Sequence, residues 1–129
     1  MTISVEIGVG EFLDKFSILD IKSEMIKDPE KLNNVLRERN ILWDSFKSII
    51  SKNPKLVNLY NELLLVNKKL WEVEDILRKH EREKKFDEHF IKYARLVYTY
   101  NDLRADIKKS INLLVGSKIV EEKSYEKYQ

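Results

Sequence analysis

The sequence predicts an all-α protein, an up-down bundle of about four helices, and three observations support this prediction. Apolar residues recur at alternating intervals of three and four over residues 56–77 and again over 86–114, which places them on one face of each helix. The connection between the two stretches is short, which favours an antiparallel hairpin. The chain of 129 residues contains only three glycines and two prolines, with 43% apolar and 36% charged residues. This composition is typical of helices with solvated outer faces, and the length suits one domain over residues 1–129.

The chain is expected to start with an extended arm over residues 1–10. Apolar residues alternate there with polar ones, a period of two that suits a strand: Ile3, Val5, Ile7 and Val9. A lone strand needs a partner for its backbone groups, so the arm is expected to dock on the helices or to pair with a second copy. A first helix over roughly 11–27 follows, with apolar residues on two nearly opposite faces, and should be sandwiched between neighbours. Together these features predict a homodimer.

Two Asx-Pro pairs divide the next part of the chain. Asp28 can cap the amides of a second helix, about 29–51, whose first position suits Pro29. Asn53 and Pro54 repeat this pattern and are expected to open a third helix that ends near residue 83.

The two heptad ladders define the third and fourth helices. Their members are Leu56, Leu59, Leu63, Val66, Leu70, Val73 and Leu77, then Phe86, Phe90, Tyr93, Val97, Tyr100, Arg104, Ile107, Ile111 and Leu114. No proline or glycine separates them, so the break is placed at residues 84–87 with Asp87 as the cap. One continuous helix over 54–115 is the alternative. Gly116 should end the fourth helix, and the partly apolar tail, 117–129, should pack back on the bundle.

Composition excludes several functional classes. The 24 basic and 22 acidic residues are interspersed and give a net charge of +2, which argues against nucleic-acid binding and against a basic membrane-surface helix. The absence of cysteine excludes disulfides, thiolate zinc sites and a cysteine nucleophile. The longest apolar run covers only residues 63–66, too short to span a membrane, and the start lacks the basic region of a secretory signal. A cytoplasmic location is therefore expected.

Charged and polar residues that interrupt the apolar ladders are the candidate functional residues. A charge buried alone is costly, so Asp14 and Arg104 each need a partner or a water-filled cleft. Two interpretations stay open: an ion pair that fixes helix register, or a guanidinium that, with Lys108, receives an anionic ligand. Asn67 and Asn101 could form a hydrogen bond between helices. The predicted polar groove consists of Asp14, Lys15, Asn67, Trp71, Glu74, Tyr98, Asn101 and Arg104.

Acidic pairs spaced three apart leave a second hypothesis open. Glu11 with Asp14, and Glu72 with Asp75, resemble the carboxylate pairs with which helical nucleotide pyrophosphohydrolases hold magnesium, although their order along the chain differs. The alternative function is therefore a magnesium-dependent enzyme acting on a phosphorylated or nucleotide-linked sugar. The sequence has no histidine pair spaced for a metal and no glycine-rich phosphate loop, so the favoured interpretation includes no metal and no cofactor.

Several short motifs resemble those of an uncharacterised bacterial family of small helical proteins, classed as a domain of unknown function. The matches are Gly10-Glu11-Phe12-Leu13-Asp14-Lys15, Ile18-Leu19-Asp20-Ile21-Lys22, Val66-Asn67, Leu70-Trp71 with Glu74-Asp75, Val97-Tyr98 with Asn101-Asp102 and Arg104, and Glu121-Glu122-Lys123-Ser124-Tyr125. The resemblance implies a family sometimes encoded near cell-surface polysaccharide genes, and it implies no activity. The chain is thus expected to be a cytoplasmic binding or interaction protein, a homodimer that takes a small anionic ligand or a protein partner.

Overall fold

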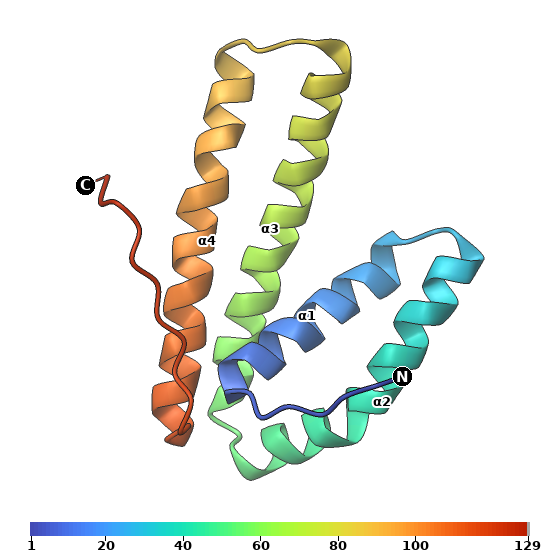
Figure 1. Ribbon diagram of the computed structural model, residues 1–129, viewed down its shortest axis with the longest axis vertical. Coiled ribbons are helices and arrows are strands. Elements are labelled where there is room, and N and C mark those ends of the chain that lie inside the picture. Colours follow the sequence, from blue (N-terminus) through green and yellow to red (C-terminus); the bar gives the residue numbers. More distant parts are fainter. Residues whose placement is uncertain (129) are drawn as a thin grey trace.

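A computed structural model describes residues 1–128, so the last residue of the expected tail, Gln129, lies outside the described residues. Four helices make up most of the chain, and no strand occurs within residues 1–128 (Figure 1). The helices are α1 (Val9–Met25), α2 (Pro29–Lys52), α3 (Leu56–Glu83) and α4 (Glu88–Val115). The all-α bundle predicted from the sequence is confirmed. No helix in residues 1–128 combines the length and apolar character needed to cross a bilayer.

The first helix lies two residues earlier in the chain than its apolar pattern predicts. Gly8 is the N-cap, and its carbonyl accepts the amide of Phe12 at 3.1 Å, so the extended arm ends at residue 8. At the other end Ile26 is already extended. Asp28 is extended too, as expected of a residue before proline, so the helix stops short of residue 27.

The acidic caps are confirmed, whereas the Asn53 cap is wrong. Asp28 accepts the amide of Lys31 at 2.9 Å, and Asp87 accepts that of Phe90 at 3.0 Å. Asn53 instead donates its side-chain amide to the carbonyl of Ile49 at 3.1 Å, and so completes the end of α2. Because its side chain is used there, α3 starts only after a turn, at Leu56, without a side-chain cap.

The antiparallel hairpin of α3 and α4 is confirmed, and the alternative of one continuous helix is wrong (Figure 1). Lys84 adopts a left-handed conformation (φ 55°) that ends α3, and residues 84–87 make the turn. Gly116 ends α4 in the same conformation (φ 66°), as expected. The tail then runs back along α4 without regular structure (Figure 1).

The core lies at one end of the hairpin, where α1 packs on both α3 and α4. Its buried members come from these three helices: Leu13, Phe16, Leu56, Tyr60, Leu63, Val66, Ile107 and Ile111. The other face of α1 is covered by α2, where Phe46 stacks on Phe16 with ring centroids 4.1 Å apart. The sandwiched first helix is thus completed within one chain, and this part of the argument for a homodimer no longer holds.

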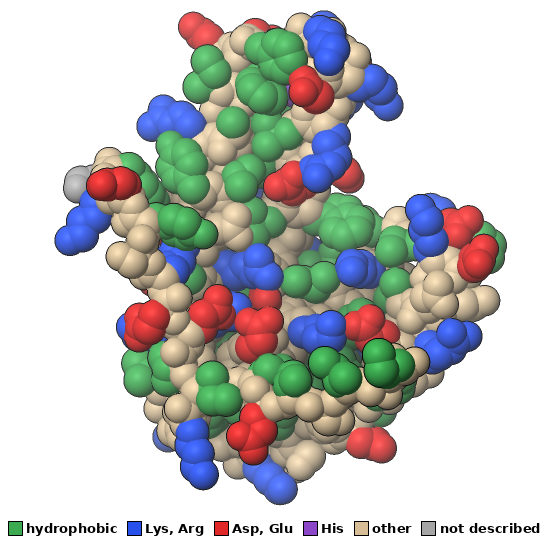
Figure 2. Space-filling view, viewed as in Figure 1, with side chains coloured by type: hydrophobic (Ala, Val, Ile, Leu, Met, Phe, Trp, Pro, Cys, Tyr) green, Lys and Arg blue, Asp and Glu red, His purple; other side chains and the backbone are tan. Residues whose placement is uncertain are grey.

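The other half of the hairpin projects beyond α1 and α2 (Figure 1). The two heptad ladders therefore contribute buried residues such as Leu63 and Val66 near α1, but only partly buried residues further along the hairpin. Leu70 and Tyr100 are half-buried at its margin, and no residue between Val73 and Ile107 is buried. Figure 2 shows hydrophobic side chains along this projecting half, and mixed acidic and basic side chains where α1 passes the hairpin.

Candidate functional site

The site forms where the start of α1 is pressed against α4. The amide of Gly10, which has no partner within its own helix, donates to Oδ1 of Asn112 at 2.8 Å. A Cβ atom on Gly10 would lie only 2.5 Å from the carbonyl oxygen of Lys108. Only glycine permits this approach, and it brings Asp14, one helical turn later, within reach of α4.

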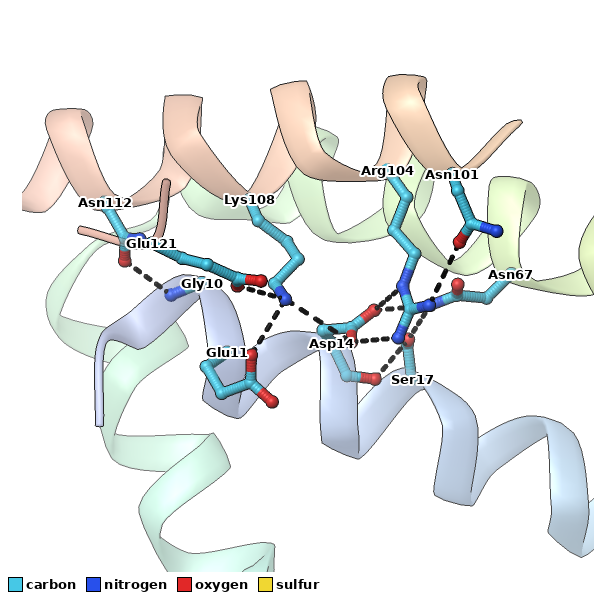
Figure 3. Close-up of polar contacts among 10 residues, drawn as sticks. All are labelled: Gly10, Glu11, Asp14, Ser17, Asn67, Asn101, Arg104, Lys108, Asn112 and Glu121. Carbon is cyan, nitrogen blue, oxygen red and sulfur yellow. Dashed lines mark hydrogen bonds and ion pairs between the residues drawn. The ribbon is translucent and has the colours of Figure 1, made fainter. Parts of the chain in front are cut away.

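Asp14 is the centre of a network that joins three helices (Figure 3). The Asp14 side chain is 2% exposed. Its two oxygens accept hydrogen bonds from Arg104, one from Nε at 2.9 Å and one from Nη2 at 2.6 Å. Asn67 on α3 donates to Asp14 Oδ1 at 2.8 Å and to Ser17 Oγ at 2.7 Å. The predicted contact between Asp14 and Arg104 is confirmed, whereas Asn67 bonds to α1 rather than to Asn101.

Every buried polar side-chain atom of this network has a hydrogen-bond partner. The hydrogen bonds that Arg104 donates to Asp14 raise the pKa of Arg104 above its ordinary value, against the opposing effect of burial. Ser17 completes the network by donating to the carbonyl oxygen of Asp14 at 2.7 Å. No buried side-chain nitrogen or oxygen in the described part of the chain lacks a partner. A buried charge that is paired and fully hydrogen-bonded can fix the register of its helices.

A second cation, Lys108, lies one turn further along α4, and its side chain is 9% exposed. Its Nζ lies 2.8 Å from Glu11, 2.6 Å from Glu121 of the tail and 4.0 Å from Asp14 (Figure 3). Burial disfavours the charge, but the hydrogen bonds to Glu11 and Glu121 outweigh it and raise the pKa of Lys108. The same contact with Lys108 lowers the pKa of Glu121.

Two clefts open on either side of Arg104. The first, which we name the indole cleft, has a volume of about 420 Å³. It is lined by Ile18, Ile21, Asn67, Leu70, Trp71, Glu74, Asp75, Arg78, Asn101 and Arg104. The second, the tail cleft, has a volume of about 770 Å³ and lies between α4 and the tail segment 121–125. Asn101 and Arg104 line both clefts, so the paired guanidinium separates them.

The structure brings most of the predicted groove residues together. Asp14, Asn67, Asn101 and Arg104 form the network, since Arg104 Nη1 also reaches Asn101 Oδ1 at 3.4 Å. Trp71 and Glu74 line the indole cleft, and Tyr98 lines the tail cleft. Lys15 lies elsewhere, because its ammonium pairs with Glu38 of α2 at 2.9 Å on the surface.

Sequence reasoning missed three residues of this site: Ser17, Asn112 and Glu121. Ser17 follows Asp14 by three positions and therefore shares its helix face, a signal that could have identified it. Asn112 lies one turn after Lys108, on the same face of α4, and could have been found in the same way. Glu121 lies in an irregular tail, where no periodicity indicates which helix the side chain will meet.

The acidic pairs do not gather into a metal-ligand set. Glu11 and Asp14 face Lys108 and Arg104, whereas Glu72 and Asp75 are exposed on α3. Within residues 1–128, no three side chains of the histidine, aspartate and glutamate types come close enough to hold one ion.

Comparison with known proteins places the chain in a family. No curated protein and no solved structure matches it. A family model described as "Family of unknown function (DUF6165)" matches residues 3–128. This match includes most of the arm and the tail as well as the four helices. The chain therefore belongs to the DUF6165 family of unknown function.

Proposed function

We propose that the protein is a binding protein that holds a small anionic ligand in the indole cleft. One observation carries the proposal: Arg104 binds Asp14 through Nε and Nη2, which leaves Nη1 with only a long contact to Asn101. The Arg104 side chain remains 29% exposed and lines the cleft. A guanidinium held rigidly in this way is pre-organised to donate to a carboxylate or phosphate.

The walls of the cleft suit a ligand with a flat or apolar body. Trp71, Ile18 and Leu70 supply apolar surface, and a small-molecule site combines such surface with a few polar groups. Arg78 offers a second cation, which is paired with Glu74 on the exposed face of α3. Exposed ion pairs of this kind contribute little, so Arg78 is free to turn to a ligand.

Thermal-shift measurements with benzoate and phenyl phosphate test the proposal. Both probes should raise the melting temperature of the wild-type protein with concentration, because they bind the folded state. Trp71→Ala and Arg78→Ala should lose this stabilisation without touching the Asp14 network. Lys15→Ala is the matched control and should retain it, because Lys15 lies outside the cleft. Failure of both probes to stabilise the wild-type protein, or an equal response from all variants, would contradict the proposal.

The alternative is the magnesium-dependent enzyme acting on a phosphorylated or nucleotide-linked sugar. Its carboxylates would have to leave Lys108 and Arg104, which hold Glu11 and Asp14, and we therefore favour binding. Magnesium with pyrophosphate in the same thermal-shift panel tests this function: stabilisation that requires both would support the enzyme.

We also propose that the protein forms a homodimer, that it is cytoplasmic, and that it takes part in cell-surface polysaccharide metabolism. The homodimer is supported by the arm, where Ile3 and Val5 are exposed and have no strand beside them in residues 1–128. The cytoplasmic location rests on the composition of the chain, and the link to cell-surface polysaccharide metabolism rests on the family resemblance.

A further inference from the structure

We propose that the ligand carries two anionic groups, and that the second binds Lys108 at the position that the carboxylate of Glu121 takes in this structure. The inference rests on the proposed function and extends it to the class of ligand. Dicarboxylates and diphosphates are the two chemical sources of such a pair of charges.

The balance of charge around Lys108 identifies Glu121 as the exchangeable group. Arg104 and Lys108 supply two positive charges, and the carboxylates of Asp14 and Glu11 already balance them. Glu121 is therefore a third carboxylate on two cations. Its carboxylate lies 2.6 Å from Lys108, and this contact lowers the pKa of Glu121, so the group that a ligand would replace is itself an anion. An anion of a ligand would meet the same cation in the same place.

The ion pairs that hold the tail next to Glu121 lie at the surface of the molecule. They join Glu122 to Lys109 at 3.2 Å and Lys123 to Asp102, and such exposed pairs contribute little to stability. The tail cleft, about 770 Å³, separates segment 121–125 from the face of α4. Release of Glu121 would therefore uncover Lys108 without disturbing the core.

The two cations are spaced for one ligand. Arg104 and Lys108 are four residues apart on α4, so their side chains share a face about one helical turn, roughly 5–6 Å, apart. Asp14 lies between them, with Oδ2 at 2.6 Å from Arg104 and 4.0 Å from Lys108 (Figure 3). Arg104 lines both clefts, whereas Lys108 lines the tail cleft and not the indole cleft. A ligand bound at Arg104 would therefore extend from the indole cleft past the guanidinium into the tail cleft, where its second anionic group meets Lys108.

Matched pairs of probes test the inference by calorimetry or thermal shift. Isophthalate should bind the wild-type protein more tightly than benzoate, and pyrophosphate more tightly than phosphate. The pair with the larger difference identifies carboxylate or phosphate as the source. Glu121→Gln removes the internal competitor, so it should tighten binding of the double anions about three- to tenfold and leave the single anions unchanged. Glu122→Gln is the matched control, because its partner is the exposed Lys109, and it should change neither.

The outcomes separate this inference from the proposed function. If benzoate binds in a Trp71-dependent manner but Glu121→Gln leaves isophthalate and pyrophosphate binding unchanged, the second subsite is overturned and the proposed function stands. If no probe binds the wild-type protein or Glu121→Gln, both are overturned. Double anions that bind only after Glu121→Gln would support the inference directly. Glu121 is mostly exposed, so this variant should fold, and circular dichroism checks that it does.

Discussion

Asp14 connects three helices through one carboxylate. This carboxylate is 2% exposed and accepts two hydrogen bonds from the guanidinium of Arg104 and one from the side-chain amide of Asn67. Few other side chains could replace aspartate at this position. Its role could be predicted because the charge interrupts an apolar ladder, and such a charge needs a partner. The identity of the partner followed from the second interruption, at Arg104.

Removal of Arg104 should therefore destabilise the fold. Arg104→Ala leaves the buried carboxylate of Asp14 without its cation, at an expected cost of about 3–5 kcal/mol in the free energy of unfolding. Asp14→Ala added to Arg104→Ala should cost little more, because the pair is already broken. Urea unfolding of the two single variants and the double variant measures the coupling. Additive losses would show that the two residues contribute independently.

The hydrogen bond between Tyr60 and Asp20 should make the protein less stable at alkaline pH. Burial, then the hydrogen bond from Tyr60 Oη to Asp20 at 2.6 Å, raises the pKa of Tyr60 far above its ordinary value. The unfolded chain loses this proton near pH 10, whereas the folded protein retains it. The free energy of unfolding should thus fall above about pH 10, by up to about 1.4 kcal/mol per pH unit from this group.

Tyr60→Phe should remove that part of the pH dependence. Lys108, whose raised pKa acts in the same direction, remains in both proteins, so the difference between their slopes isolates the tyrosine. Urea titrations across the alkaline range measure it. A variant with the same slope as the wild-type protein would show that Tyr60 ionises as readily when folded.

At the scale of helices, the sequence predicted the elements well and their ends less well. The ladders specify α3 and α4 because an apolar face forms whatever its neighbours are, and Asp28 and Asp87 cap helices through local bonds. The start of α1 was misplaced because Gly8 caps without a side chain. Asn53 was misassigned because its side chain can complete the preceding helix as readily as it can open the next one.

The two halves of the hairpin should differ in stability. Leu63 is fully buried in the core, and Leu63→Ala should lower the free energy of unfolding by about 2–5 kcal/mol. Leu77 lies on the projecting half and is only half-buried, so Leu77→Ala should cost less, about 1 kcal/mol. Hydrogen exchange should be faster in residues 74–99 than in residues 56–67. Equal costs and equal protection would indicate that something covers the projecting half in solution.

At the scale of the whole molecule, the placement of the tail and arm could not be predicted from periodicity. The tail is held by ion pairs between an irregular segment and α4, and these depend on the course of the chain after Gly116. For the arm, the sequence shows a clear pattern but the structure shows no backbone partner within residues 1–128. Its alternating pattern was evident, but no hydrogen bond within the described residues engages the backbone of residues 1–7.

The arm predicts a homodimer in which two copies pair their strands. In the view of Figure 1 it runs from the start of α1 toward α2, and Ile3 is 82% and Val5 70% exposed. A two-stranded pair is only marginally stable by itself, so exposed apolar residues of α2, Leu36 and Ile41, are expected to contribute. Light scattering at tens of micromolar should give the mass of a dimer.

Two variants of the arm separate strand pairing from nonspecific association. Val5→Lys places a charge among the apolar side chains and should give a folded monomer, because the change lies outside the bundle. Ser4→Lys, the matched control, points to the opposite side of an extended strand and should leave the dimer intact. Amides of residues 2–7 should also exchange slowly in the dimer and quickly in the Val5→Lys protein, because strand pairing would engage backbone groups that have no partner in one chain. A wild-type protein that scatters as a monomer, with these amides unprotected, would rule out strand pairing between copies.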